Sequence, residues 1–150
     1  MTVTDNPVAY CGLWCEGCPL FTGRAAGLAR DLKTELDSMR FEKAAEAMSK
    51  IPAFEALAGY PACRGVLDII EQMHCPATCR GGGGNPRCAI RSCCTGKGFD
   101  GCWECDRFET CGHLEILVNA HGTAHLVSLR TIAANGLDAF LAGDKPWFTD

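Results

Sequence analysis

Residues 10–19 read Tyr-Cys-Gly-Leu-Trp-Cys-Glu-Gly-Cys-Pro and place three cysteines, Cys11, Cys15 and Cys18, within eight positions. Intervals of two and three residues allow thiolates on one tight loop to converge on a single metal ion or cluster. Gly12 and Gly17 permit the positive φ angles that such loops need. The stretch therefore predicts a metal-binding loop near the beginning of the chain.

The same cysteine spacings return further along the chain. The whole sequence contains 12 cysteines in 150 residues, a fraction at which cysteine serves either in disulfides or as a metal ligand. We predict metal ligation. The predicted ligands are Cys11, Cys15 and Cys18 at one site, four of Cys88, Cys93, Cys102, Cys105 and Cys111 at another, and Cys75 and Cys79 as the next candidates.

Composition and charge exclude several classes of protein. No stretch approaches the ~18 consecutive apolar residues of a membrane span, and a formal net charge of −4 argues against a nucleic-acid partner. Neither the composition nor the net charge argues against a protein partner. Residues 1–10 contain no basic residue and no apolar run, so we expect no secretory signal. We therefore predict a cytoplasmic protein with reduced thiols, and disulfides, which the even cysteine count allows, are the less favoured alternative.

The regions with one cysteine or none carry helical patterns. Apolar residues recur at intervals of three and four over 24–50, and again over 63–74 and 113–142, with breaks at Gly122 and near Gly136. Thr123 is expected to cap the helix that follows it. Residues 75–112 are rich in turn formers and lack sustained periodicity. The predicted fold is a single mainly α domain over 1–150, with helices packed around an irregular cysteine-rich segment held together by metal.

The identity of the metal is open at this level. All-cysteine ligation suits a closed structural zinc site, which we take as the leading prediction. It also suits an iron–sulfur cluster that serves electron transfer or a redox accessory subunit, which is the alternative. His74 and His113 are candidate fourth ligands, and Arg91 is expected to donate a hydrogen bond to a thiolate sulfur.

Two further functions are less favoured. A thiol-redox protein would use Cys15 and Cys18 or Cys102 and Cys105, but no βαβ pattern surrounds either pair. His121 and His125 are spaced like a zinc-protease pair, but Gly122 occupies the position of the required glutamate. No Ser–His–Asp set or carboxylate pair stands out, so the sequence leans against an enzyme.

Two blocks of the sequence resemble the domain-of-unknown-function 3795 family, small cysteine-rich proteins of bacteria and archaea. The first block is residues 10–19, and the second comprises Cys88 to Cys93, Lys97-Gly98, Cys102 to Phe108 and Cys111. The resemblance implies a zinc-binding protein whose activity is not established. The family often has a middle Cys-x-Gly-Cys, whereas Val66 follows Gly65 here, which argues against Cys63 as a ligand. Cys94 looks like a local addition.

Overall fold

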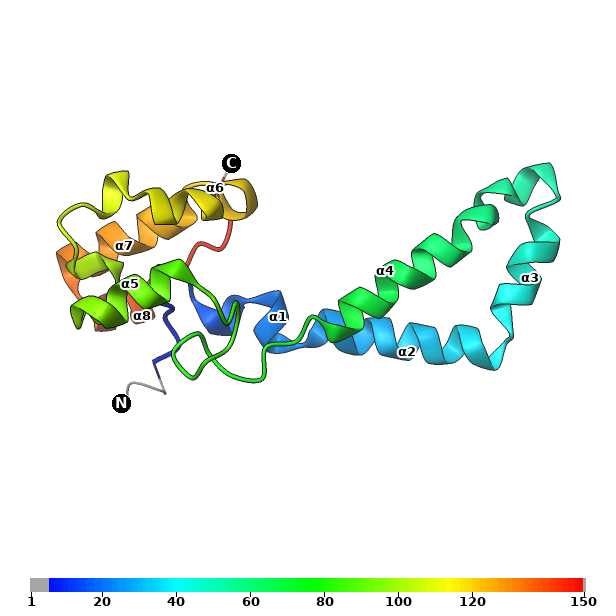
Figure 1. The fold of residues 1–150 in the computed structure, drawn as a ribbon, viewed down its shortest axis with the longest axis horizontal. Helices are drawn as coiled ribbons and strands as arrows, with labels where there is room; N and C mark the ends of the chain where they lie inside the picture. Colours follow the sequence, from blue (N-terminus) through cyan, green and yellow to red (C-terminus); the bar gives the residue numbers. More distant parts are fainter. Residues whose placement is uncertain (1–5, 150) are drawn as a thin grey trace. The chain divides into compact units, whose positions relative to one another are not determined.

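The computed structural model describes residues 6–149, and its regular structure over these residues is helical (Figure 1). No strand occurs there, and the β pairing is one isolated bridge between Val8 and Trp14. The predicted mainly α fold is confirmed. The chain forms two compact units, one of residues 22–74 and one that combines the N-terminal residues up to 21 with residues 75 onward.

The 22–74 unit is a helical hairpin with a bent tip. It contains α2 (Arg24–Ser38), α3 (Phe41–Met48), the 3-10 segment η2 (Pro52–Gly59) and α4 (Tyr60–Gln72), and α2 and α4 lie side by side (Figure 1). The helix expected over 24–50 is interrupted because Arg40 has a left-handed backbone, with φ 53°. Ion pairs join the two long helices, from Lys33 to Asp68 and Glu71 and from Arg64 to Asp37.

The other unit contains the cysteine-rich segments and the C-terminal helices. Its elements are η1 (Cys15–Gly17), α1 (Pro19–Thr22, whose last residue falls in the hairpin unit), α5 (Ala89–Lys97), η3 (Cys102–Glu104), η4 (Phe108–Thr110), η5 (Gly112–Leu114), α6 (Glu115–His121), α7 (Ala124–Asn135) and α8 (Leu137–Ala142). The breaks expected at Gly122 and Gly136 are confirmed.

Two local expectations were wrong in this unit. Helix α5 lies within the segment expected to be irregular, and it buries only Ile90 and Cys94, so its apolar pattern is too short to detect. Thr123 makes no side-chain cap to α7. Its own N–H instead donates to Thr149 Oγ1 at 2.6 Å.

Helix α7 is the centre of the core in this unit. Its buried face includes Leu129 and Ile132. Leu129 belongs to a buried cluster with Tyr10, Ile90 and Leu114, and Ile132 packs with Val8 and Phe140. The N-terminal loop and the cysteine-rich segment therefore pack against the same helix. Over the described residues, no helix has both the length and the apolar character needed to span a membrane.

Candidate metal centre

The first cysteine loop is shaped by short backbone bonds and one glycine. The N–H of Ala9 donates to the carbonyl of Leu13 at 2.8 Å, and the N–H of Gly12 donates to the carbonyl of Ala9 at 2.9 Å. Gly12 has φ 87°, and a Cβ there would lie 3.0 Å from the Leu129 side chain. The loop thus lies directly against α7, in a conformation that only glycine adopts readily.

A second loop, residues 75–84, is held beside the first. The N–H of Cys75 donates to the carbonyl of Leu20 at 2.9 Å. The Arg91 guanidinium donates to the carbonyls of Cys79 and Gly83, each at 2.9 Å, and to that of Asn85 at 2.6 Å. The expectation that Arg91 donates to a thiolate sulfur was wrong, because these carbonyls take its hydrogen bonds.

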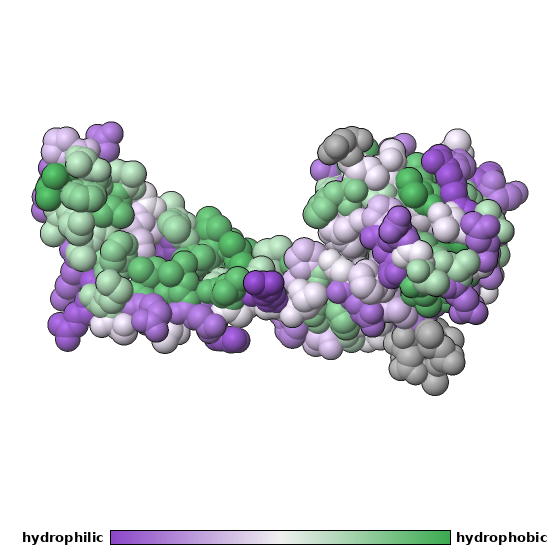
Figure 2. Space-filling view, turned by 180° about the vertical axis from the view of Figure 1, so that it is seen from behind, coloured by the Kyte–Doolittle hydropathy of each residue, from purple (hydrophilic) through white to green (hydrophobic). Residues whose placement is uncertain are grey.

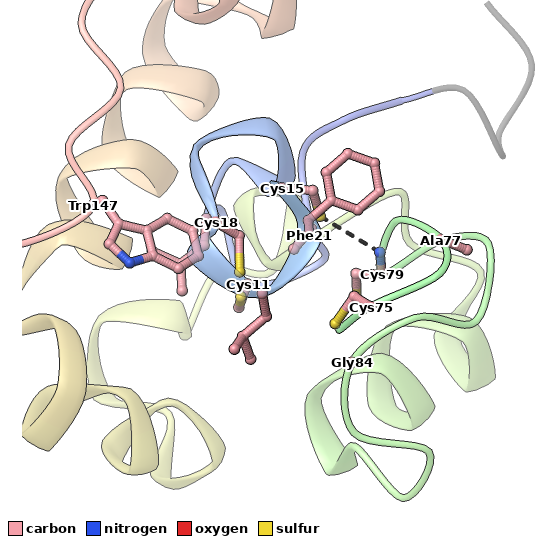
Figure 3. Close-up of a pocket in the computed structure, with 12 residues that line it drawn as sticks. Cys11, Cys15, Cys18, Phe21, Cys75, Ala77, Cys79, Gly84 and Trp147 are labelled. Carbon is pink, nitrogen blue, oxygen red and sulfur yellow. Dashed lines mark hydrogen bonds between the residues drawn. The ribbon is translucent and has the colours of Figure 1, made fainter. Parts of the chain in front are cut away.

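The two loops bring five cysteines to one cavity of about 150 Å³, lined by Cys11, Cys15, Cys18, Cys75 and Cys79 (Figure 3). Apart from Gly84, the remaining lining residues are apolar: Ala9, Leu13, Leu20, Phe21, Ala77 and Trp147. The N–H of Cys79 donates to Cys15 Sγ at 3.4 Å. Hydrogen bonds of this kind stabilise a thiolate and orient a metal-bound sulfur.

Burial controls the protonation of two of these thiols, those of Cys11 and Cys15. Burial, with a smaller contribution from the neighbouring sulfurs of Cys79, Cys88 and Cys15, raises the pKa of Cys11 to about 12 against the opposing effect of a Leu13 backbone hydrogen bond. Burial also raises the pKa of Cys15, while the N–H of Cys79 opposes this shift. The thiols of Cys11 and Cys15 are therefore neutral at pH 7, and a metal cation that binds them must displace their protons.

The second predicted ligand set is not gathered at one place. Cys93, Cys105 and Cys111 line another pocket together with His113, with a volume of about 350 Å³. Cys102 is buried in the core, with its Sγ 3.5 Å from that of Cys94. Cys88 stands at the N-cap of α5 and packs against the same core cluster.

The remaining candidates lie in the hairpin unit. Cys63 is exposed on α4. The ring of His74 packs against Gly23, where a Cβ would lie 2.7 Å from it.

Within residues 6–149, no three His, Cys, Asp or Glu side chains stand close enough together to hold a single metal ion. The five pocket cysteines thus surround a space larger than one ion.

Sequence reasoning missed Arg80, which links the cysteine segments. Its Nε donates to the carbonyl of Val8 at 2.8 Å, and its Nη2 donates to the carbonyl of Asp100. Its guanidinium also lies over the rings of Tyr10, 4.5 Å from the centroid, and Trp103, at 5.6 Å. Its position directly after Cys79 in a glycine-rich loop was the available signal, but its partners are distant in sequence.

Comparison with known proteins gives a family and no named activity. No curated protein and no solved structure matches the chain. A family model described as a protein of unknown function matches residues 7–116, a range that includes all 12 cysteines. Helices α7 and α8 and Trp147 lie beyond the matched range. The chain belongs to this family of unknown function, DUF3795.

Proposed function

We propose that the protein binds a cysteine-ligated metal centre in the pocket formed by Cys11, Cys15, Cys18, Cys75 and Cys79. The observation that carries the proposal is their convergence from two loops on one cavity with an otherwise apolar lining. Cys15 and Cys79 are 64 residues apart in sequence and in direct contact. Cysteines that merely fill a core would pack against other apolar groups, whereas a ring of thiols around a cavity provides soft ligands for a metal.

The size of the cavity favours an iron–sulfur cluster as the occupant. A single zinc ion holds each sulfur about 2.3 Å from the metal and draws four sulfurs into contact with one another. In a cluster, different cysteines bind different irons, so their sulfurs stand further apart. Four of the five cysteines would hold such a cluster. It would supply one-electron redox chemistry, whose potential depends on burial and on hydrogen bonds such as that from Cys79 to Cys15.

Structural zinc is the second candidate, and the second pocket favours it. Three cysteines and one histidine, Cys93, Cys105, Cys111 and His113, line that pocket. This donor set is one of the usual sets for structural zinc. The four side chains do not converge on one point in the structure, so a zinc ion bound by all of them would have to draw them together. It would then link α5 to the irregular segment that follows it and contribute to folding stability.

Metal analysis of protein purified without oxygen tests both proposals. We expect a brown protein that contains iron and acid-labile sulfide in stoichiometric amounts, with zinc as an additional component. A colourless protein that contains zinc alone would overturn the cluster proposal. A protein with neither metal and with free or paired thiols would overturn both and favour thiol-redox chemistry.

Serine variants locate the centres. Cys15→Ser and Cys79→Ser should each lose most of the iron and sulfide. The matched control is Cys63→Ser, because Cys63 is exposed on α4 and lines neither cysteine pocket. Cys105→Ser should lower the zinc content and leave the iron content unchanged. Equal iron in the Cys15 and Cys63 variants would show that the cluster is not in this pocket.

A further inference from the structure

The hairpin unit, residues 22–74, leaves most of its large apolar side chains uncovered. All of these residues are described, and the fully buried ones are three alanines, Ala26, Ala29 and Ala45. Apolar side chains gather over the hairpin on the face that Figure 2 shows. The large hydrophobic residues between 44% and 65% exposed in this unit are Leu28, Leu32, Met39, Ile51, Phe54, Val66, Ile69 and Met73. A unit of this size without a large buried side chain has no adequate core of its own.

The exposed apolar residues follow helical spacing on both long helices. Leu28 and Leu32 on α2 and Met39 at its C-cap form a stripe, since their spacings return to the same side of the helix. Val66 and Ile69 on α4 and Met73 at its C-cap form a second stripe. The charged residues that face the neighbouring helix occupy other positions and are paired within the hairpin, as in the contact of Lys33 Nζ with Glu71 Oε2 at 2.5 Å. The α4 stripe therefore carries no charge that would oppose burial. The α2 stripe has the exposed carboxylate of Glu35 along one edge, where it stays in contact with solvent when a partner covers the apolar residues.

We propose that a second copy of this chain covers these stripes, so that two α2–α4 hairpins pack together as a four-helix bundle. The charge of the unit supports a self-complementary contact, because residues 22–74 contain seven basic and eight acidic residues. A nearly neutral surface neither selects an acidic or basic partner nor repels its own copy. Antiparallel helices with short connections and an apolar face are the usual components of such bundles.

The available area matches what a stable dimer requires. The six stripe residues are each about half exposed, which leaves roughly 100 Å² on each for side chains of this size. Together they offer about 600 Å² per copy, or about 1,200 Å² for the pair, which is the lower end of the range for a specific, stable interface. Helices of 15 and 13 residues are about 20 Å long, which provides three to four turns of contact.

Molar mass measured by light scattering on the intact, metal-loaded protein tests the dimer. We expect about twice the 16.1 kDa of one chain. The double variant Leu32→Glu/Val66→Glu should be monomeric, with an association at least about tenfold weaker and with unchanged metal content and helicity. The matched control is Ile116→Glu, which places the same charge on a residue that is 71% exposed but lies on α6. It should remain dimeric.

Hydrogen exchange on the wild-type protein keeps the test independent of the variants. Dilution should raise exchange in α2 and α4 in step with dissociation and leave α7 unchanged. A wild-type protein that is monomeric at all accessible concentrations would overturn the proposal. The stripes would then be covered by another part of the same chain or by a different protein. A dimer that persists in the Leu32/Val66 double variant would also overturn it.

Discussion

Gly12 determines how closely the first cysteine loop approaches the core. Its φ of 87° and the 3.0 Å separation between its Cβ position and Leu129 leave no space for a side chain. The change Gly12→Ala should lower the free energy of unfolding by about 1–3 kcal/mol, because it adds backbone strain and moves the loop away from α7. Chemical denaturation of the variant and the wild type measures the difference.

Gly96 supplies the control for that substitution. It lies within α5 with no neighbouring atom near its Cβ position and no positive φ. Gly96→Ala should therefore be neutral or should stabilise the protein by roughly 0.5–1 kcal/mol, as alanine does in a helix. A Gly12 variant as stable as the Gly96 variant would show that the loop tolerates displacement from α7.

His125 makes stability depend on pH. Its side chain is buried on α7, and among the described residues Nδ1 has no hydrogen-bond partner. Burial, and secondarily the charge of His121, lower the pKa of His125 below its ordinary value. The unfolded chain therefore binds a proton at a higher pH than the folded chain, and the free energy of unfolding falls as the pH drops through about 6.5.

Denaturation at pH 7.5 and pH 5.5 measures this contribution. His125→Gln should lose less stability over that interval than the wild type, because glutamine does not titrate. The control, His74→Gln, should keep the wild-type dependence, because His74 is exposed and lines neither cysteine pocket. The same loss in the wild type and the His125 variant would assign the pH dependence to other groups.

At the scale of elements, the C-terminal segment completes the cysteine pocket. The Nδ1 of His121 donates to the carbonyl of Trp147 at 3.0 Å, and the N–H of Thr149 donates to the carbonyl of His121 at 3.2 Å. The sequence argued against a metal site at His121 and His125. In the structure, His121 holds the C-terminal segment in place through these two hydrogen bonds. Trp147 thereby lies at the pocket, as Figure 3 shows.

Removal of the indole should open the pocket to reagents. In metal-free protein, Trp147→Ala should speed alkylation of the pocket cysteines several-fold. Mass spectrometry of the Cys11–Cys18 and Cys75–Cys79 peptides measures the alkylation rate. Phe148→Ala is the matched control, because Phe148 also stacks on His121 but is 65% exposed and does not line the pocket. Equal alkylation rates in the two variants would contradict a covering role for Trp147.

The elements that could be predicted from the sequence are those with long apolar periodicity. Helices α2, α4 and α7 repeat their apolar residues over three or more turns, and Gly122 and Gly136 mark helix ends. Helix α5 was missed because two buried residues make no pattern. The left-handed Arg40, which divides the helix expected over 24–50, had no signal because arginine rarely adopts that conformation.

The candidate site was predictable only in part, for a related reason. Spacing shows that Cys11, Cys15 and Cys18 belong together, since a short loop constrains them. Spacing between distant blocks does not show where they meet in space. The placement of Cys75 and Cys79 at the same pocket depends on Arg91 and on the bond from Cys75 to Leu20, which bring together residues far apart in sequence.

At the scale of the whole molecule, the two units are stabilised by different interactions. The hairpin unit has ion pairs between α2 and α4 and few buried side chains. The other unit has a core around α7, in which Leu129 is fully buried, together with the five cysteines of the proposed centre. A loss of metal should therefore affect the chain unevenly.

Hydrogen exchange before and after metal removal measures that unevenness. Chelation under anaerobic conditions should raise exchange most in residues 11–18 and 75–88, because these loops contain the five pocket cysteines and little regular structure. Helix α7 should change less, because its protection comes from apolar burial, and the hairpin unit contains none of the five. Cys15→Ser without chelator should reproduce the pattern. A uniform rise across all helices would contradict it and would show that the metal stabilises the fold as one cooperative unit.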